Sequence, residues 1–425
     1  MVMAAALALA VGAVVAWPAA SPEPAPEPAA PLIRRLLRPY GQDLLVRADP
    51  LTLRRVSRPL GVPRDAFGHA FSPDGAMLAL GSSHGPAVSL TDLRLWRPLG
   101  SVELRGRGAA RPLAWPESSG LIVALSLPFP RQAIAVVDPT TGRTLVRRSW
   151  RGEGIAEAAG AFGVVTLVSP PRRIAPARLV HVDPAGALRS VPLSRIRAGY
   201  ARPQRRTGVP RSQVPGLAVD PARRRAYVLA VRAPLVAEVG LASGQVAYHR
   251  LRGRAPGDRL AAAVAAKGGR FEAAHRVARW LGDGLIAISG DDRSARPGRR
   301  TRVAPFGVRL IDTTRWTTSL LDARPTSIAL AGNRVLATGR RGVDWDHQGK
   351  RDAGLQVFRQ RRLYVRFPGE DVSVYGVHGR RAYVWVRRTR ALHTLDVGSG
   401  RSLYVRRTPP RRLPSLLVPE GPDAG

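Results

Sequence analysis

The sequence contains no cysteine and almost no lysine. Without cysteine, its 425 residues cannot form disulfide bonds, a thiolate nucleophile, a lipid-modified cysteine anchor or a thiolate zinc site. Only Lys267 and Lys350 are lysine among 67 basic residues, so nearly all of the positive charge is carried by arginine. A chain of this length and 44% hydrophobic content can nevertheless form a sizeable core.

The net charge of +37 taken alone favours a polyanionic partner. However, the arginines occur along the whole body of the chain, and their abundance beside alanine, glycine and proline is typical of a GC-biased genome. We therefore expect no specific binding of nucleic acid. The partner that we expect is an unknown protein or an anionic ligand of the cell envelope.

A short apolar strand, a turn that is often led by aspartate, and a second strand recur eight times. The clearest copies are Ile134 to Val146 and Leu392 to Val405. Asp92, Asp138 and Asp183 follow one another at intervals of about 45 residues, which is typical of a propeller when no long helix lies in the unit. Aspartate at the start of the turn bonds to the backbone that follows it, and glycine at the end supplies a positive φ.

Three of the copies carry a family resemblance. GLAVDPARRRAYVLAV from Gly216 and GVHGRRAYVWVRRTRALHTLDVGSGRSLYV from Gly376 resemble the YVTN-type propeller repeats of secreted prokaryotic proteins. AFSPDGAMLALGSS from Ala70 is similar to a tryptophan-aspartate (WD) repeat, although the terminal Trp-Asp pair is missing. The resemblance implies an all-β propeller whose function is open, because such repeats serve binding, scaffolding and catalysis alike.

The number of blades follows less directly from the sequence. Seven full four-stranded units run from about Phe67 to Arg407, which favours seven blades. The hairpin around Asp49 and the strand LPSLLVP near the C-terminus are left over. Because propellers often close by pairing strands from both ends, these two can complete a shared blade, and eight blades is the alternative.

Two insertions interrupt the repeat. Asp258 to Gly269 is expected to form a short helix, capped by Asp258 and ended by Gly268. Ser194 to Gln213 is expected to form a loop rich in arginine. Insertions lie on one face of such a ring, where propellers bind. The candidate electropositive binding residues are Arg195, Arg197, Arg202, Arg205, Arg206 and Arg211.

One loop has the spacing of a calcium site. From Asp344 to Asp352 it resembles the D-x-D-x-D-G-x-x-D loops of FG-GAP-type propellers, and the candidate ligands are Asp344, Asp346, Gln348 and Asp352. Lys350 and Arg351 lower its negative charge, so we favour a surface loop without metal and keep calcium as the alternative. No other cofactor is expected.

No residue is assigned a catalytic role. The histidines, which include His181, His249, His275 and His393, lack the spacing of a metalloprotease or zinc site, so we expect them to be packed or exposed. Asp291 and Asp292 are an acidic pair that we expect to be solvated in a loop.

The N-terminal segment suggests export. Residues 1–20, with an unbroken apolar run from Met1 to Trp17, are expected to be a signal peptide or membrane anchor. Residues 21–40 are expected to be a Pro/Ala-rich linker, and 41–425 the propeller. No basic residue precedes the apolar run and Arg34, Arg35 and Arg38 follow it, which is unusual for an exported chain.

The preferred function is that of an exported, extracytoplasmic propeller of the cell envelope. We expect it to be a monomer that binds a ligand or protein without catalysis and contacts the membrane only through its N-terminal segment. The alternative is a lactonase-like propeller hydrolase with a metal in the central channel. A cytosolic nucleic-acid scaffold is a third hypothesis.

Overall fold

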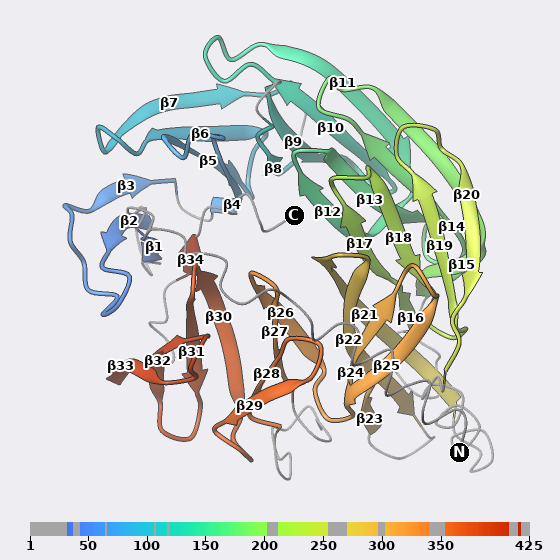
Figure 1. The fold of residues 1–425 in the computed structure, drawn as a ribbon. Helices are drawn as coiled ribbons and strands as arrows, with labels where there is room; N and C mark the ends of the chain where they lie inside the picture. The colour runs from blue at the N-terminus through green and yellow to red at the C-terminus, as the bar shows by residue number, and fades with distance from the viewer. Residues whose placement is uncertain are drawn as a thin grey trace. The chain divides into compact units, whose positions relative to one another are not determined.

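The computed structural model describes residues 32–36, 43–63, 66–105, 108–116, 120–201, 211–253, 270–295, 302–339, 353–407 and 415–417. All regular secondary structure in these ranges is β-strand (Figure 1). The predicted helix from Asp258 to Gly269 and the apolar run from Met1 to Trp17 lie outside them. Within the described ranges no helix is long and apolar enough to span a membrane.

Pairing arranges most described strands into eight antiparallel groups of four. The first group contains β34 (Ser415–Leu417), β1 (Leu32–Leu36), β2 (Asp43–Ala48) and β3 (Leu60–Val62). The next three contain β4 (Ala66–Phe71), β5 (Met77–Ser82), β6 (Ala87–Asp92) and β7 (Arg97–Glu103); β8 (Ala110–Ala114), β9 (Leu121–Ser126), β10 (Arg131–Val137) and β11 (Thr144–Arg151); and β12 (Glu153–Gly160), β13 (Gly163–Ser169), β14 (Ala175–Val182) and β15 (Leu188–Ala201).

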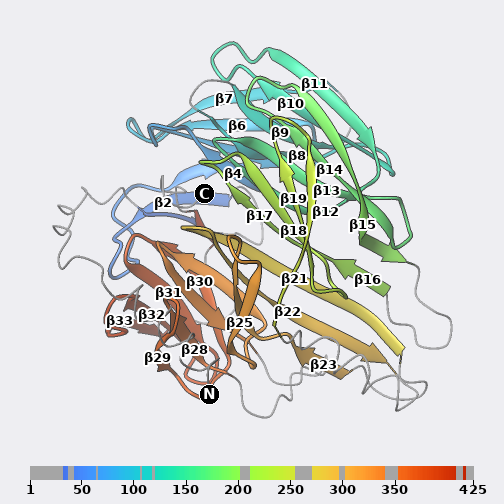
Figure 2. The same cartoon turned by 45° about the vertical axis from the view of Figure 1, so that its right-hand side comes forward.

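The remaining four groups follow the same order along the chain. They contain β17 (Gly216–Asp220), β18 (Arg225–Leu229), β19 (Leu235–Gly240) and β20 (Val246–Arg250); β21 (Arg270–Gly282), β22 (Leu285–Ala295), β24 (Val308–Asp312) and β25 (Thr317–Asp322); β26 (Ser327–Ala331), β27 (Arg334–Thr338), β28 (Leu355–Phe358) and β29 (Arg362–Arg366); and β30 (Val372–His378), β31 (Arg381–Val386), β32 (Ala391–Asp396) and β33 (Ser402–Arg407). Two short strands, β16 (Arg211–Val214) and β23 (Arg302–Pro305), pair with the long β21–β22 hairpin, which Figure 2 shows extending past its neighbours.

Strand burial explains this arrangement. β13 is buried along its whole length, as expected for a strand covered on both faces, whereas β11 at the outer edge of its group is mostly exposed. The apolar residues of each group pack against the next group. One cluster joins Leu179 of β14 to Val228 of β18, and another joins Ala48 of β2 to Tyr383 of β31. Because the last group packs on the first, the core passes through every group in turn.

The two ends of the described chain share one sheet. Arg34 of β1 lies opposite Leu416 of β34 and, on its other side, Val46 of β2. The predicted sharing of a sheet by the leftover segments is therefore present. The described strands form six sheets, two of which each join two of the groups, and this division into eight groups does not confirm the preference for seven blades. β1 also lies within residues 21–40, which the sequence assigned to the linker; its backbone pairs on both sides, and that pairing makes it a strand.

The turns follow the predicted chemistry. The Asp138 carboxylate accepts hydrogen bonds from the backbone N–H of Thr140 at 2.8 Å and from the hydroxyl groups of Thr140 and Thr141 at 2.6 and 2.7 Å. Gly142 closes the turn with a φ of 71°. These hydrogen bonds stabilise the ionised carboxylate and hold the pKa of Asp138 well below its usual range.

This turn chemistry predicts a loss of stability in acid. The pKa of Asp49 is lowered by the backbone N–H of Thr52, and the pKa of Asp74 by the hydroxyl of Ser72. A carboxyl group whose pKa is lower in the folded state stabilises it above the unfolded value of 3.8, and this contribution disappears as the pH falls through the folded value. The melting temperature should therefore fall steeply as the pH drops below 3.8.

The measurement is a series of thermal melts between pH about 7 and about 2. A variant carrying Asp49→Asn, Asp74→Asn and Asp138→Asn should start from a lower melting temperature and show a shallower fall. If the melting temperatures of the triple variant and the wild type fall equally in acid, these three carboxylates are not the cause of the acid sensitivity.

Candidate functional site

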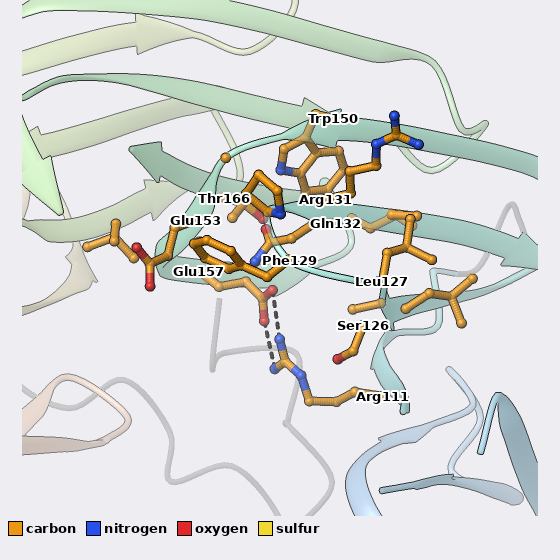
Figure 3. A pocket seen from close by; sticks show the side chains of 18 of the residues that line it. Arg111, Ser126, Leu127, Phe129, Arg131, Gln132, Trp150, Glu153, Glu157 and Thr166 are labelled. Carbon is orange, nitrogen blue, oxygen red and sulfur yellow. Dashed lines mark hydrogen bonds and ion pairs between the residues drawn. The ribbon is translucent and has the colours of Figure 1, made fainter. Parts of the chain in front are cut away.

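A cavity of about 630 Å³ lies between the group β8–β11 and the strands β12 and β13. Its walls come from the turn between β9 and β10, from the end of β11 and from β12. Figure 3 shows the polar side chains at this place, which include Gln132, Glu153, Glu157 and Thr166. A volume of this size is in the range of small-molecule sites.

An ion pair crosses the cavity. Arg111 of β8 contacts Glu157 of β12 through two parallel bonds of 2.8 and 2.9 Å, drawn as dashed lines in Figure 3. This bidentate geometry is stronger and more directional than a single contact. Gly68 of β4 permits it, because a Cβ atom at Gly68 would lie 2.3 Å from the Cγ atom of Arg111. The two charges are thus fixed across two adjacent groups of strands.

Two aromatic side chains border the cavity. Phe129 lies in the turn between β9 and β10 and is 53% exposed, and the Arg172 guanidinium lies 5.0 Å from its ring centroid. Trp150 at the end of β11 is buried, and its indole N–H has no hydrogen-bond partner in the described ranges. A buried indole N–H normally finds a partner, and leaving it unpaired costs about 1–3 kcal/mol.

The predicted arginine surface is only partly described. Arg202, Arg205 and Arg206 lie outside the described residues. Ser194 to Ala201 is strand, not loop, because β15 continues to Ala201 and β16 begins at Arg211. In β15 the exposed Arg195 and Arg197 alternate with the buried Ile196 and Ala198, a period of two that the arginine content concealed.

Of the candidate arginines that the structure describes, Arg195, Arg197 and Arg211 do not line the cavity. The Arg195 guanidinium lies 5.2 Å from the ring centroid of Tyr248, and Arg197 donates to the carbonyl of Ile174 at 2.9 Å. Arg211 is half-buried in β16. Binding of an anionic ligand at this surface stays a prediction.

The candidate calcium ligands Asp344, Asp346, Gln348 and Asp352 lie outside the described residues. Within the described ranges, no group of three or more histidine, aspartate or glutamate side chains is placed to hold a metal ion. The metal-dependent hydrolase alternative thus gains no specific observation from this part of the chain.

A second polar constellation was missed by the sequence analysis. Ser212 of β16, His275 of β21 and Asp291 of β22 lie on adjacent strands, and the Ser212 hydroxyl and His275 Nε2 are 2.8 Å apart. The next residue on each of the two long strands is also charged: Arg276 Nη2 and Asp292 Oδ1 form a buried ion pair and lie 2.7 Å apart. The expectation that Asp291 and Asp292 are solvated in a loop is therefore wrong, because both lie in β22 and Asp292 is buried.

Burial shifts the pKa values of His275 and Asp292. Burial lowers the pKa of His275, and the Asp291 carboxylate opposes that shift only in part. Burial also raises the pKa of Asp292, although Arg276 acts in the opposite direction. The only sequence signal for this cluster is the alternation of charged with small residues in two long strands, which is weak evidence for burial.

Neither a protein-family model nor a curated protein matches the chain. Among solved structures it is similar to the dihydro-heme d1 dehydrogenase NirN, with 15% identity and a TM-score of 0.54 over 95% of this chain and 78% of that one. Weaker likenesses are to the periplasmic gluconolactonase PpgL of Pseudomonas aeruginosa (12% identity, TM-score 0.41, 80% and 98% covered) and to the β-propeller domain of Cps50 (Swd1) from Myceliophteria thermophila (10%, 0.39, 79% and 94%). At these identities the comparison shows the fold alone, and the chain is a β-propeller.

Proposed function

We propose that the protein is an extracytoplasmic binding propeller that holds a small, neutral, hydroxyl-rich ligand, such as a saccharide, in the cavity beside Arg111 and Glu157. The observation that carries this proposal is a 630 Å³ cavity lined by a fixed ion pair, polar side chains and two aromatic rings. The extracytoplasmic location rests on the apolar run and proline-rich segment of the N-terminus.

The ligand class follows from the balance of charges at the cavity. Arg111 and Arg131 oppose Glu153 and Glu157, so the lining has no net formal charge and disfavours a strongly anionic ligand. Gln132 and Thr166 offer both donors and acceptors, as hydroxyl groups require. The exposed ring of Phe129 can pack against the C–H face of a sugar.

We also propose that the propeller has eight blades. The support is the division of the described strands into eight groups of four, with apolar clusters between successive groups. The sheet that β34 shares with β1 to β3 would be the eighth blade. Every group of strands would then have a neighbouring group on each side.

The binding proposal predicts a specific loss of affinity. A panel of neutral mono- and oligosaccharides should contain at least one that raises the melting temperature of the wild type by mass action. Phe129→Ala should weaken its binding by about five- to tenfold and lower the stability of the free protein by no more than about 1 kcal/mol, because the ring is exposed and its contact within the protein is that with the Arg172 guanidinium.

The matched control is Leu403→Ala in β33, which removes a similarly exposed apolar side chain that does not line the cavity. It should leave saccharide binding unchanged. The proposal fails if no neutral saccharide shifts the wild-type melting curve, or if Phe129→Ala binds as tightly as the control.

A further inference from the structure

Ser212, His275 and Asp291 form a polar row across three adjacent strands. Ser212 of β16 lies opposite Ala273 of the parallel strand β21, two residues before His275, so Ser212 and His275 are on the same face of the sheet. His275 in turn lies directly opposite Asp291 of β22. The strand register therefore brings a hydroxyl, an imidazole and a carboxylate together from distant parts of the sequence.

The geometry of the first pair is that of a nucleophile and its base. The Ser212 hydroxyl and His275 Nε2 are 2.8 Å apart, within the reach needed for direct proton transfer. When the hydroxyl donates this hydrogen bond, the imidazole proton must reside on Nδ1. Burial lowers the pKa of His275, so the ring is neutral near pH 7 and can accept a proton.

The carboxylate of Asp291 is incompletely bonded. Its Oδ2 accepts a hydrogen bond from Arg293 at 3.1 Å, whereas its buried Oδ1 has no hydrogen-bond partner in the described residues. A buried carboxylate oxygen without a partner is costly, and a purely structural polar row would be expected to satisfy it. In the neighbouring ion pair, by contrast, Asp292 Oδ1 accepts from Arg276 at 2.7 Å.

We propose that Ser212 is a nucleophile for small activated esters, with His275 as its general base and with the carboxylate of Asp291, which lies directly opposite His275 on the next strand, as the charge that favours the protonated imidazole. This site is formed by strands other than those of the saccharide cavity, so the inference is independent of the proposed binding function. It departs from the expectation of a protein without catalysis, and it requires no metal.

The reaction balances with water as the second reactant. His275 Nε2 takes the proton of Ser212 as the oxygen attacks the ester carbonyl carbon, and a new C–O bond forms. The tetrahedral intermediate expels the alcohol, which receives the proton from His275. Water then loses a proton to His275 and attacks the acyl carbon, the bond to Ser212 breaks, and Ser212 recovers the proton.

The test uses a fluorophosphonate probe on the full-length protein, followed by peptide mass spectrometry. The wild type should be labelled at Ser212, Ser212→Ala should not be labelled, and His275→Gln should be labelled at least about 100-fold more slowly. Ser289→Ala is the matched control, because Ser289 is a buried serine of β22 whose hydroxyl donates to the carbonyl of Pro325. It should be labelled like the wild type. Melting curves of all variants report whether they fold.

The role of Asp291 has its own readout. The charged groups that act on His275 are Asp291, Asp292 and Arg293 of β22 and Arg276 of its own strand. Because Asp291 raises the pKa of His275, Asp291→Asn should move the midpoint of the pH profile of labelling to lower pH, besides slowing it. A folded wild type that is not labelled at Ser212, or a Ser212→Ala variant labelled at the wild-type rate, would overturn the proposal.

Discussion

Replacement of Arg276 by alanine is expected to lower the free energy of unfolding by about 3–5 kcal/mol, because it leaves Asp292 buried without its counter-ion. The side chains of Arg276 and Asp292 are 1% and 3% exposed. Arg276 also donates to the carbonyls of His275 and Asp291, each at 3.0 Å, and its guanidinium lies 3.9 Å from the ring centroid of Phe306. A third hydrogen bond reaches the carbonyl of Val231 at 3.3 Å, so one substitution removes an ion pair, three hydrogen bonds to backbone carbonyls and a ring contact.

The free energy of unfolding that Arg276→Ala loses should increase as the pH rises. Burial already raises the pKa of Asp292, and without Arg276 that pKa must rise further. A carboxyl group whose pKa is higher in the folded state destabilises that state as the pH rises above the unfolded value. Urea denaturation of Arg276→Ala should therefore show a deficit that grows from pH about 4 to about 7.

Two further variants test this explanation. Arg276→Met combined with Asp292→Leu should recover most of the stability, because a well-packed apolar pair can replace a buried ion pair. Arg387→Ala breaks the exposed pair with Asp371 and should cost no more than about 1 kcal/mol. Equal losses for Arg276→Ala and Arg387→Ala would show that the buried pair has no special role.

The second large effect is expected at Tyr383, where the last group of strands packs on the first. Its ring is fully buried in a cluster with Ala48 and Leu53, and its hydroxyl donates to the carbonyl of Pro50 at 2.8 Å. Tyr383→Ala should lower the free energy of unfolding by about 3–5 kcal/mol through the cavity that it leaves. Tyr383→Phe, which loses only the hydrogen bond, should cost about 1 kcal/mol.

Alkaline denaturation separates these two contributions. Burial raises the pKa of Tyr383 to about 12, with Asp49 acting in the same direction and Arg381 against it. A tyrosine whose pKa is higher in the folded state contributes stability that is complete below the unfolded value of 10 and disappears as the pH rises toward the folded value. The wild type should lose more stability than Tyr383→Phe over that interval, and equal losses would assign the effect to other groups.

The sequence was a good guide to local structure and a poor one to contacts between distant segments. The turns at Asp138 and Asp396 form as predicted, because their hydrogen bonds lie within a few residues. The sharing of a sheet by both ends followed from a general property of propellers. By contrast, β1 was assigned to a linker, since nothing within Leu32–Leu36 indicates the two strands that pair with it.

The same distinction applies to the candidate sites. Arg111 and Glu157 come from different groups of strands, and neither is part of a motif. The sequence predicts that Asp292, as half of an acidic pair, is solvated at the surface, yet the register of β21 and β22 buries it beside Arg276. Spacing in one sequence identifies residues that act within a single turn, but these sites are assembled by register across several strands.

The pairing of β34 with β1 has a consequence for the order of folding. β34 is the last described strand to leave the ribosome, and until it arrives β1 has a neighbour on one side only. Before β34 is synthesised, a nascent chain therefore has an open sheet edge at β1, and pairing over so long a sequence separation favours slow folding and misassembly. The sheet that contains β1 is therefore complete only after β34 has been synthesised, so the first and the last described strands must meet in the final step of its assembly.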